Sequence, residues 1–162
     1  MKLKDQLDKF KLTKIRLNLA VVNSEISFQQ ADKDAAWELH IEMLTRIVTQ
    51  PLPSDAGDEK TALDSVYALF AITREILRRH GRGTIQFSKI AIPVLNQIVR
   101  PFTAKWHKES LAGAFEHETK RKEFRDELEI LQSELRNYNS LLAEIAGVED
   151  LTGLEQTTPE VT

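Results

Sequence analysis

The fold is decided by residues 116–146, which read EHETKRKEFRDELEILQSELRNYNSLLAEIA. Apolar residues recur in this stretch at alternating spacings of four and three, the a/d pattern of a heptad helix, and charged residues lie between them. The seam consists of Phe124, Leu128, Leu131, Leu135, Tyr138, Leu142 and Ile145. At 1.5 Å per residue this helix would be roughly 45 Å long, more than a compact domain of this size needs. We therefore predict a long C-terminal helix that projects in part.

The heptad seam has two interpretations at this stage. The helix packs across the chain's own bundle, or it pairs with a second copy of the chain or with a partner protein. The second interpretation predicts a homo-oligomer, or a complex with a partner protein, held together by the C-terminal helix.

The residues before the heptad helix indicate further helices. One stretch runs from an N-cap at Asp32 or Asp34 to about Thr49, with Trp37 and Ile41 on the predicted core face. A second begins at Asp58 or Thr61 and ends at Gly81, where glycine suits the C-terminal cap. A third helix is capped by Ser88, and because of Pro93 it either kinks or begins late, near Ile92. A further helix then starts at Pro101, with Arg100 as its N-cap. The pattern predicts an all-α (mainly α) fold, a helical bundle.

The two ends of the chain are less regular. Residues 3–28 fit a helix by their spacing of three and four, but alternating Ile15, Leu17 and Leu19 also fit a short β-hairpin near residues 13–28. Residues 147–162 contain few apolar side chains and are expected to be a disordered tail. The predicted organisation is one helical domain, residues 1–146, followed by that tail.

The composition excludes several classes of function. The chain has no cysteine, which rules out disulfide frameworks, thiolate zinc sites and cysteine nucleophiles and is typical of a reducing, cytoplasmic location. Charged residues at the N-terminus and the lack of a long apolar run predict neither a signal peptide nor a membrane span. The four histidines are scattered and the glycines do not form a phosphate loop, so we expect no metal and no cofactor.

The charge is unevenly distributed along the chain. Residues 73–108 carry eight basic side chains and one acidic one, a balance of +7, which leaves −10 for the rest of a chain whose total is −3. Besides Arg100, the basic residues are Arg74, Arg78, Arg79, Arg82, Lys89, Lys105 and Lys108. They predict a surface for RNA, DNA or a nucleotide, although cations near helix C-termini can equally complement the helix dipole.

A short motif lies within the basic stretch, RPFTAKWH at residues 100–107. Arg100 and His107 in an all-helical chain of this size resemble the Arg-x4-6-His signature of HEPN-type ribonucleases. The resemblance implies a symmetric dimer in which these two residues cleave RNA without a metal, through attack by the ribose 2′-hydroxyl. Histidine would then act as acid or base and arginine would stabilise phosphate charge. In the structural alternative, Arg100 caps or forms an ion pair and His107 hydrogen bonds at the rim of the helix.

Two classes of function follow from the sequence. The first is a non-enzymatic interaction module, which associates through the heptad helix and presents its basic centre to nucleic acid or a nucleotide. The alternative is the HEPN-like ribonuclease. Either would suit a small protein of a bacterial defence or toxin operon.

Overall fold

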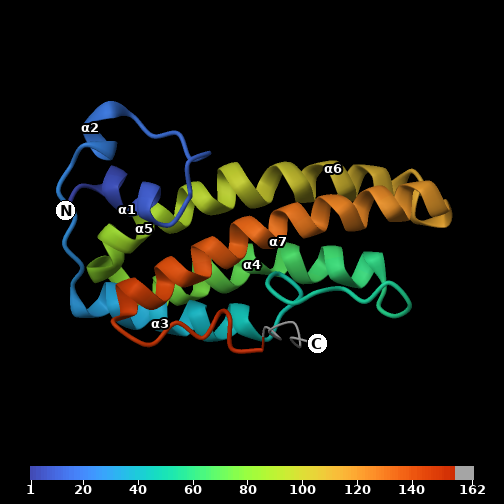
Figure 1. Ribbon diagram of the computed structural model, residues 1–162. Helices are drawn as coiled ribbons and strands as arrows, with labels where there is room; N and C mark the ends of the chain where they lie inside the picture. Colours follow the sequence, from blue (N-terminus) through green and yellow to red (C-terminus); the bar gives the residue numbers. More distant parts are fainter. Residues whose placement is uncertain (156–162) are drawn as a thin grey trace, which may run out of the picture.

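The computed structural model describes residues 1–155, and over this range it contains helices and no strand (Figure 1). The α-helices are α1 (Leu3–Lys9), α2 (Leu19–Val22), α3 (Gln30–Leu44), α4 (Glu59–His80), α5 (Ile85–Pro93), α6 (Arg100–Leu111) and α7 (Glu118–Ala146). Two 3-10 turns, η1 (Gly81–Thr84) and η3 (Ala114–Glu116), and a π-helical stretch, η2 (Val94–Val99), connect them. The predicted all-α helical bundle is confirmed.

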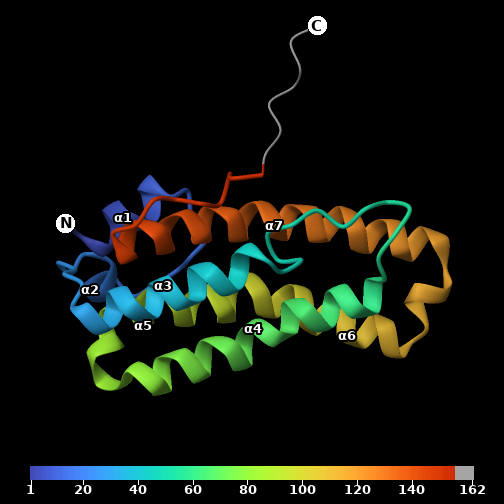
Figure 2. The same ribbon diagram turned by 90° about the horizontal axis from the view of Figure 1, so that it is seen from below.

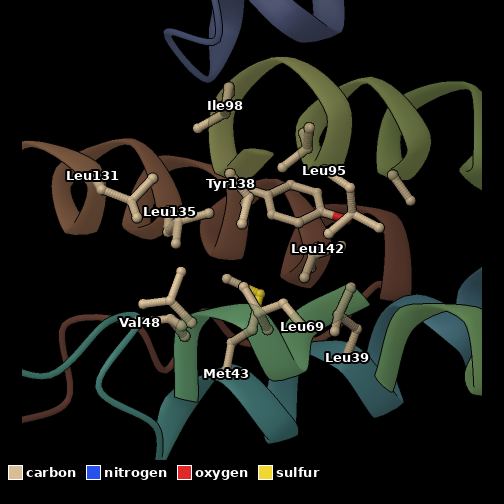
Figure 3. Close-up of a cluster of buried hydrophobic side chains, with 14 of the residues drawn as sticks. Leu39, Met43, Val48, Leu69, Leu95, Ile98, Leu131, Leu135, Tyr138 and Leu142 are labelled. Atoms are coloured by element: carbon tan, nitrogen blue, oxygen red, sulfur yellow. The ribbon is translucent and has the colours of Figure 1, made fainter. Parts of the chain in front are cut away.

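The heptad seam of α7 lies inside the chain's own bundle. All seven seam residues are buried, with at most 5% of their surface exposed. Figure 3 shows Leu131, Leu135, Tyr138 and Leu142 facing side chains of α3, α4 and η2. At the other end of α7, the Phe124 ring packs against Phe102 and Trp106 of α6. The seam is therefore core along its whole length, in agreement with the first interpretation, in which the helix packs across the chain's own bundle. The prediction that the helix projects in part is wrong, and association with a second copy or a partner stays a prediction.

Helix α3 turns a different face to the core from the one predicted. The helix starts at Gln30, and the Asp32 carboxylate accepts a hydrogen bond from the Gln29 backbone N–H at 2.8 Å. Leu39 and Met43 are buried, whereas Trp37 and Ile41 are 42% and 40% exposed. The predicted core face was wrong because α3 packs against both α7 and α4, and the side facing them carries the small residues Ala35 and Ala36.

The segment from Ile85 to Leu111 is one continuous rod, made of α5, η2 and α6 (Figure 1). The predicted late start and further helix are wrong, and Ser88 lies inside α5, where its hydroxyl donates to the Thr84 carbonyl at 2.7 Å. Pro93 and Pro101 each lack an N–H, and the π-helical stretch lies between them. A wider turn there lets the helix continue without the hydrogen bonds that the prolines cannot donate.

The N-terminal segment forms neither a long helix nor a hairpin. Between α1 and α3 it contains the four-residue helix α2, and its one β-bridge joins Lys2 to Glu25. Leu12, Ile15 and Ile26 reach the core from an irregular backbone. The proposed β-hairpin at residues 13–28 is therefore wrong, because these apolar residues pack individually and do not alternate along a strand.

The chain also keeps its order beyond α7, contrary to the prediction for residues 147–155. Gly147 has the positive φ of +70° typical of a helix C-terminus, and the chain folds back along the bundle (Figure 2). The Asp150 carboxylate accepts a hydrogen bond from the Thr152 backbone N–H at 2.9 Å. Residues 156–162 of the predicted tail lie outside the described residues. Within residues 1–155, no helix is long and apolar enough to cross a membrane.

Burial of the seam generates a stability prediction with a control on the same helix. Leu135 is fully buried and Ile130 is 61% exposed. Leu135→Ala should lower the free energy of unfolding by about 2–5 kcal/mol, because it removes apolar contacts and leaves a cavity. Ile130→Ala should lower it by less than about 1 kcal/mol. Urea denaturation followed by circular dichroism measures both. Equal effects of the two substitutions would contradict the burial of the seam.

Candidate functional site

Helices α4 and α6 pack side by side, and a row of planar side chains crosses their contact. The Arg100 guanidinium lies over the Phe70 ring, 4.5 Å from its centroid. The Phe70 and Tyr67 rings are 5.7 Å apart, and the Tyr67 and His107 rings meet edge to face at 4.9 Å. Both residues of the predicted Arg-x6-His motif therefore face α4.

Arg100 and His107 do not meet within one chain. Seven residues of helix separate them by about 10 Å along the axis. Two hydrogen bonds to Asn96 Oδ1, at 3.3 Å from Nε and 3.1 Å from Nη2, hold Arg100 in place. A single phosphodiester cannot reach both side chains of one chain in a catalytic geometry, since a general acid or base must lie within hydrogen-bond distance of its proton.

Other cations extend the row along both helices. Arg74 and Arg78 follow Phe70 at spacings of four, which places them on neighbouring turns beside the α6 contact. Lys108 directly follows His107 on α6, and all three cations are exposed. Within residues 1–155, none of the three forms an ion pair, and the one bond that Arg78 donates goes to the Arg74 carbonyl at 3.4 Å. We call Arg74, Arg78, Arg100 and Lys108 the α4/α6 basic face.

Two of the predicted anion-binding residues, Arg79 and Lys105, form ion pairs with acidic residues of this chain. Arg79 pairs with Glu38 of α3 and, at 3.1 Å, with Glu75. Lys105 pairs with Glu123, at 3.0 Å, and with Glu127, which also accepts a hydrogen bond from Trp106 Nε1 at 2.8 Å. These two cations tie helices together.

The remaining two basic residues lie outside the α4/α6 basic face. Arg82 is exposed in the 3-10 turn that follows α4. Lys89 lies on α5, half-buried, where its ammonium donates to Gln86 Oε1 at 3.0 Å. Four of the eight basic residues of the stretch 73–108 are thus exposed on α4 and α6 without an ion pair within residues 1–155, and three of them, Arg74, Arg78 and Arg100, lie beside the contact of the two helices.

The sequence prediction missed three residues that build this surface, namely Tyr67, Phe70 and Asn96. Tyr67 is 51% exposed. A signal for it existed, because Tyr67, Arg74 and Arg78 lie at helical spacings of seven and four and so share a stripe. Asn96 lies four residues before Arg100, which is the spacing of neighbours on one helix face, so a signal for this contact also existed.

A hollow with mainly apolar walls lies elsewhere, between α6 and α7. Its volume is about 370 Å³ and its walls include Ile98, Phe102 and Leu131. The charges at its rim are already paired, as Lys14 bonds Glu134 at 2.8 Å and Lys105 bonds Glu127. Each charged residue of the hollow has a partner, although Glu134 Oε2 is buried without a hydrogen bond, and we place the candidate site on the α4/α6 basic face, where whole cations are unpaired within residues 1–155. Among the described residues, no group of three histidine or acidic side chains could hold a metal ion.

The structural role of Lys105 generates a pH prediction. Hydrogen bonds from Lys105 and then Lys120 hold the pKa of Glu123 below its usual value of 4.5, although partial desolvation opposes them. A lowered pKa in the folded state means that the carboxylate stabilises the fold above about pH 4.5, and that this stability is lost as the pH falls through the folded-state pKa. The difference in unfolding free energy between wild type and Glu123→Gln should therefore stay constant from about pH 6 to 8 and shrink below about pH 4.5.

Urea denaturation over this pH range measures the effect. Glu129→Gln is the control, because Glu129 is exposed on the same helix and forms no ion pair within the described residues. A difference between wild type and Glu123→Gln that does not change with pH would contradict the ion pair.

The candidate site is thus an open, convex surface rather than a cleft. It combines two cations of α4, two of α6, and the rings of Tyr67 and His107. No family model matches the chain, and no match is found among curated proteins or solved structures.

Proposed function

We propose that this protein is a non-enzymatic helical module that binds the phosphate groups of nucleic acid through the α4/α6 basic face. The observation that carries the proposal is that some cations of residues 73–108 form ion pairs while others do not. Arg79 and Lys105 are neutralised by acids of neighbouring helices, whereas Arg74, Arg78, Arg100 and Lys108 are exposed and form no ion pair within residues 1–155. Unpaired arginine and lysine side chains on one surface are the usual electrostatic footprint of nucleic-acid binding.

Stabilisation of helix C-termini by cations explains the positions of only some of these basic residues. Arg78 lies in the last turn of α4 and Lys108 in the last turn of α6, where cations stabilise the helix end. Arg74 lies before the last turn, and Arg100 lies within the continuous rod, where no free C-terminal carbonyls are available. These two arginines therefore support a ligand rather than a helix cap.

The net negative charge of the rest of the chain favours nucleic-acid binding at the α4/α6 basic face only. Outside the stretch 73–108 the formal charge is −10, so the rest of the chain, taken as a whole, does not favour phosphate groups. Exposed acids near the basic face are engaged, since Asp64 pairs with Lys60 and Glu75 with Arg79. A nucleic acid is thereby directed to the α4/α6 basic face.

Binding of a labelled 20-nucleotide RNA, measured by fluorescence anisotropy between 50 and 200 mM KCl, tests this function. Affinity should fall steeply with salt because each neutralised phosphate releases counterions. Arg74→Gln with Arg78→Gln should weaken binding and lower the slope of log Kd against log salt by about 1.4, at about 0.7 for each lost contact to a single strand. The matched control is Arg79→Gln with Lys105→Gln, which removes the same charge and should leave the slope unchanged.

Three results would overturn the proposal. They are absence of binding, binding that does not respond to salt, and equal losses in the two double variants. The circular dichroism spectrum and melting temperature of each variant establish that the fold is intact.

A second candidate function is the metal-independent ribonuclease implied by the HEPN resemblance. The observation that favours it is that Arg100 and His107 lie on one side of α6 beside the other cations of the face. Because one chain keeps the two about 10 Å apart along the helix, cleavage requires a second copy of this face across a two-fold axis.

The ribonuclease is tested by incubating RNA with the protein in EDTA. If this function is correct, wild type cleaves the RNA and Arg100→Ala with His107→Ala does not, because both the acid or base and the phosphate contact are lost. Intact RNA after incubation with wild type, or the same cleavage by the double variant, excludes the ribonuclease.

A further inference from the structure

An exposed tyrosine, Tyr67, lies on the same stripe of α4 as Arg74 and Arg78, two turns before Arg74. Tyr67 exposes 51% of its surface, while its neighbour Phe70 exposes 4%. Contacts with Phe70 on one side and His107 on the other fix the orientation of the phenol ring. A large ring that is held in place but half open to solvent can take a planar ligand with little loss of side-chain entropy.

We infer that the ligand is single-stranded nucleic acid, with an unpaired base stacked on Tyr67 and the neighbouring phosphates on Arg74, Arg78 and Arg100. This inference rests on the proposed function and adds the substrate class. Proteins that bind single strands combine a basic track with aromatic side chains on which bases stack. Here the aromatic side chain and the cations belong to one surface, whose parts are linked by the ring contacts of Tyr67 with Phe70 and His107.

Arg100 contributes a second planar group beside the tyrosine. Its guanidinium lies over the Phe70 ring and is hydrogen bonded to Asn96, so both contacts restrict its position. Arg100 is nevertheless exposed, which leaves it accessible to a ligand. Unpaired bases stack on arginine planes as well as on aromatic rings.

The shape of the site disfavours a duplex. Two packed helices have axes 8–10 Å apart and are each about 10 Å across, so together they present a surface about 18–20 Å wide. The major groove of B-form DNA is only about 12 Å wide, which admits a single helix. A duplex could therefore contact this face through its backbone alone, with its bases paired and out of reach of Tyr67. A single strand can offer bases and phosphates to the same face.

The experiment compares four oligonucleotides of 12 residues or base pairs, namely oligo(U) RNA, oligo(dT) DNA, and an RNA and a DNA duplex. Anisotropy is measured with the full chain and with Tyr67→Ala and Tyr67→Phe. Tyr67→Ala should weaken binding of both single strands about fivefold to a hundredfold, as expected for loss of one base-aromatic stack. Tyr67→Phe keeps the ring and should retain the affinity. The salt slope should be the same in all three proteins, because the phenol ring neutralises no phosphate.

The outcomes separate this inference from the proposed function. If duplexes bind as tightly as single strands and Tyr67→Ala has no effect, the single-strand inference fails and the phosphate-binding module stands. If Tyr67→Phe loses as much affinity as Tyr67→Ala, the hydroxyl and not stacking is responsible, and the inference also fails. If no oligonucleotide binds wild type, both fail. A preference for RNA over DNA among the single strands supports the inference and identifies which of the two is the ligand.

Discussion

The apolar seam of α7 is the constraint on which the rest of the structure depends. The helix has 29 residues and is therefore about 43 Å long, and its seam is buried from Phe124 to Ile145. Within residues 1–155, several elements cover the seam together. Helix α3 covers the C-terminal part of the seam, and α6 with η3 covers the N-terminal part. The requirement to cover both parts explains why the segment 85–111 continues as a helix through two prolines.

Polar side chains of α7 hold the loop between α3 and α4 in place through hydrogen bonds and an ion pair. Gln132 donates to the carbonyl oxygens of Ile47 and Gln50, at 2.7 Å each, and is itself buried. Arg125 bonds Glu59 at 3.1 Å and the Pro53 carbonyl at 2.6 Å. The loop between α3 and α4 is thereby fastened to α7, which sets the position of α4 and hence of the surface formed by Tyr67, Arg74 and Arg78.

The spacing of apolar residues correctly predicted where the long helices form, but it did not predict which elements pack against each helix. Spacing gave the existence of α7, the cap of α4 at Asp58 and the residues of the seam, because each depends on local geometry. It could not say which molecule covers a seam, since an a/d stripe fits a partner helix and the chain's own helices equally well. On α3 both Trp37 and Leu39 lie on plausible apolar faces, and only the position of α7 and α4 decides that Leu39 is buried.

In the candidate site, too, helical spacing is predictable from the sequence, whereas the partner of each side chain is not. Arg78 and Arg79 are adjacent in sequence and identical in chemistry, but successive residues point about 100° apart on a helix. That rotation brings Arg79 to Glu38 on α3 and leaves Arg78 in solvent. On α6 the same rule separates Lys105, which faces the acids of α7, from Arg100 and His107, which face α4. A count of charges along the chain predicts a basic region, but only the partners of each side chain decide which cations hold the bundle together and which remain for a ligand. The acids of α3 and α7 neutralise the cations that face them, and within residues 1–155 this leaves Arg74, Arg78 and Arg100 without an ion pair beside the contact of α4 with α6.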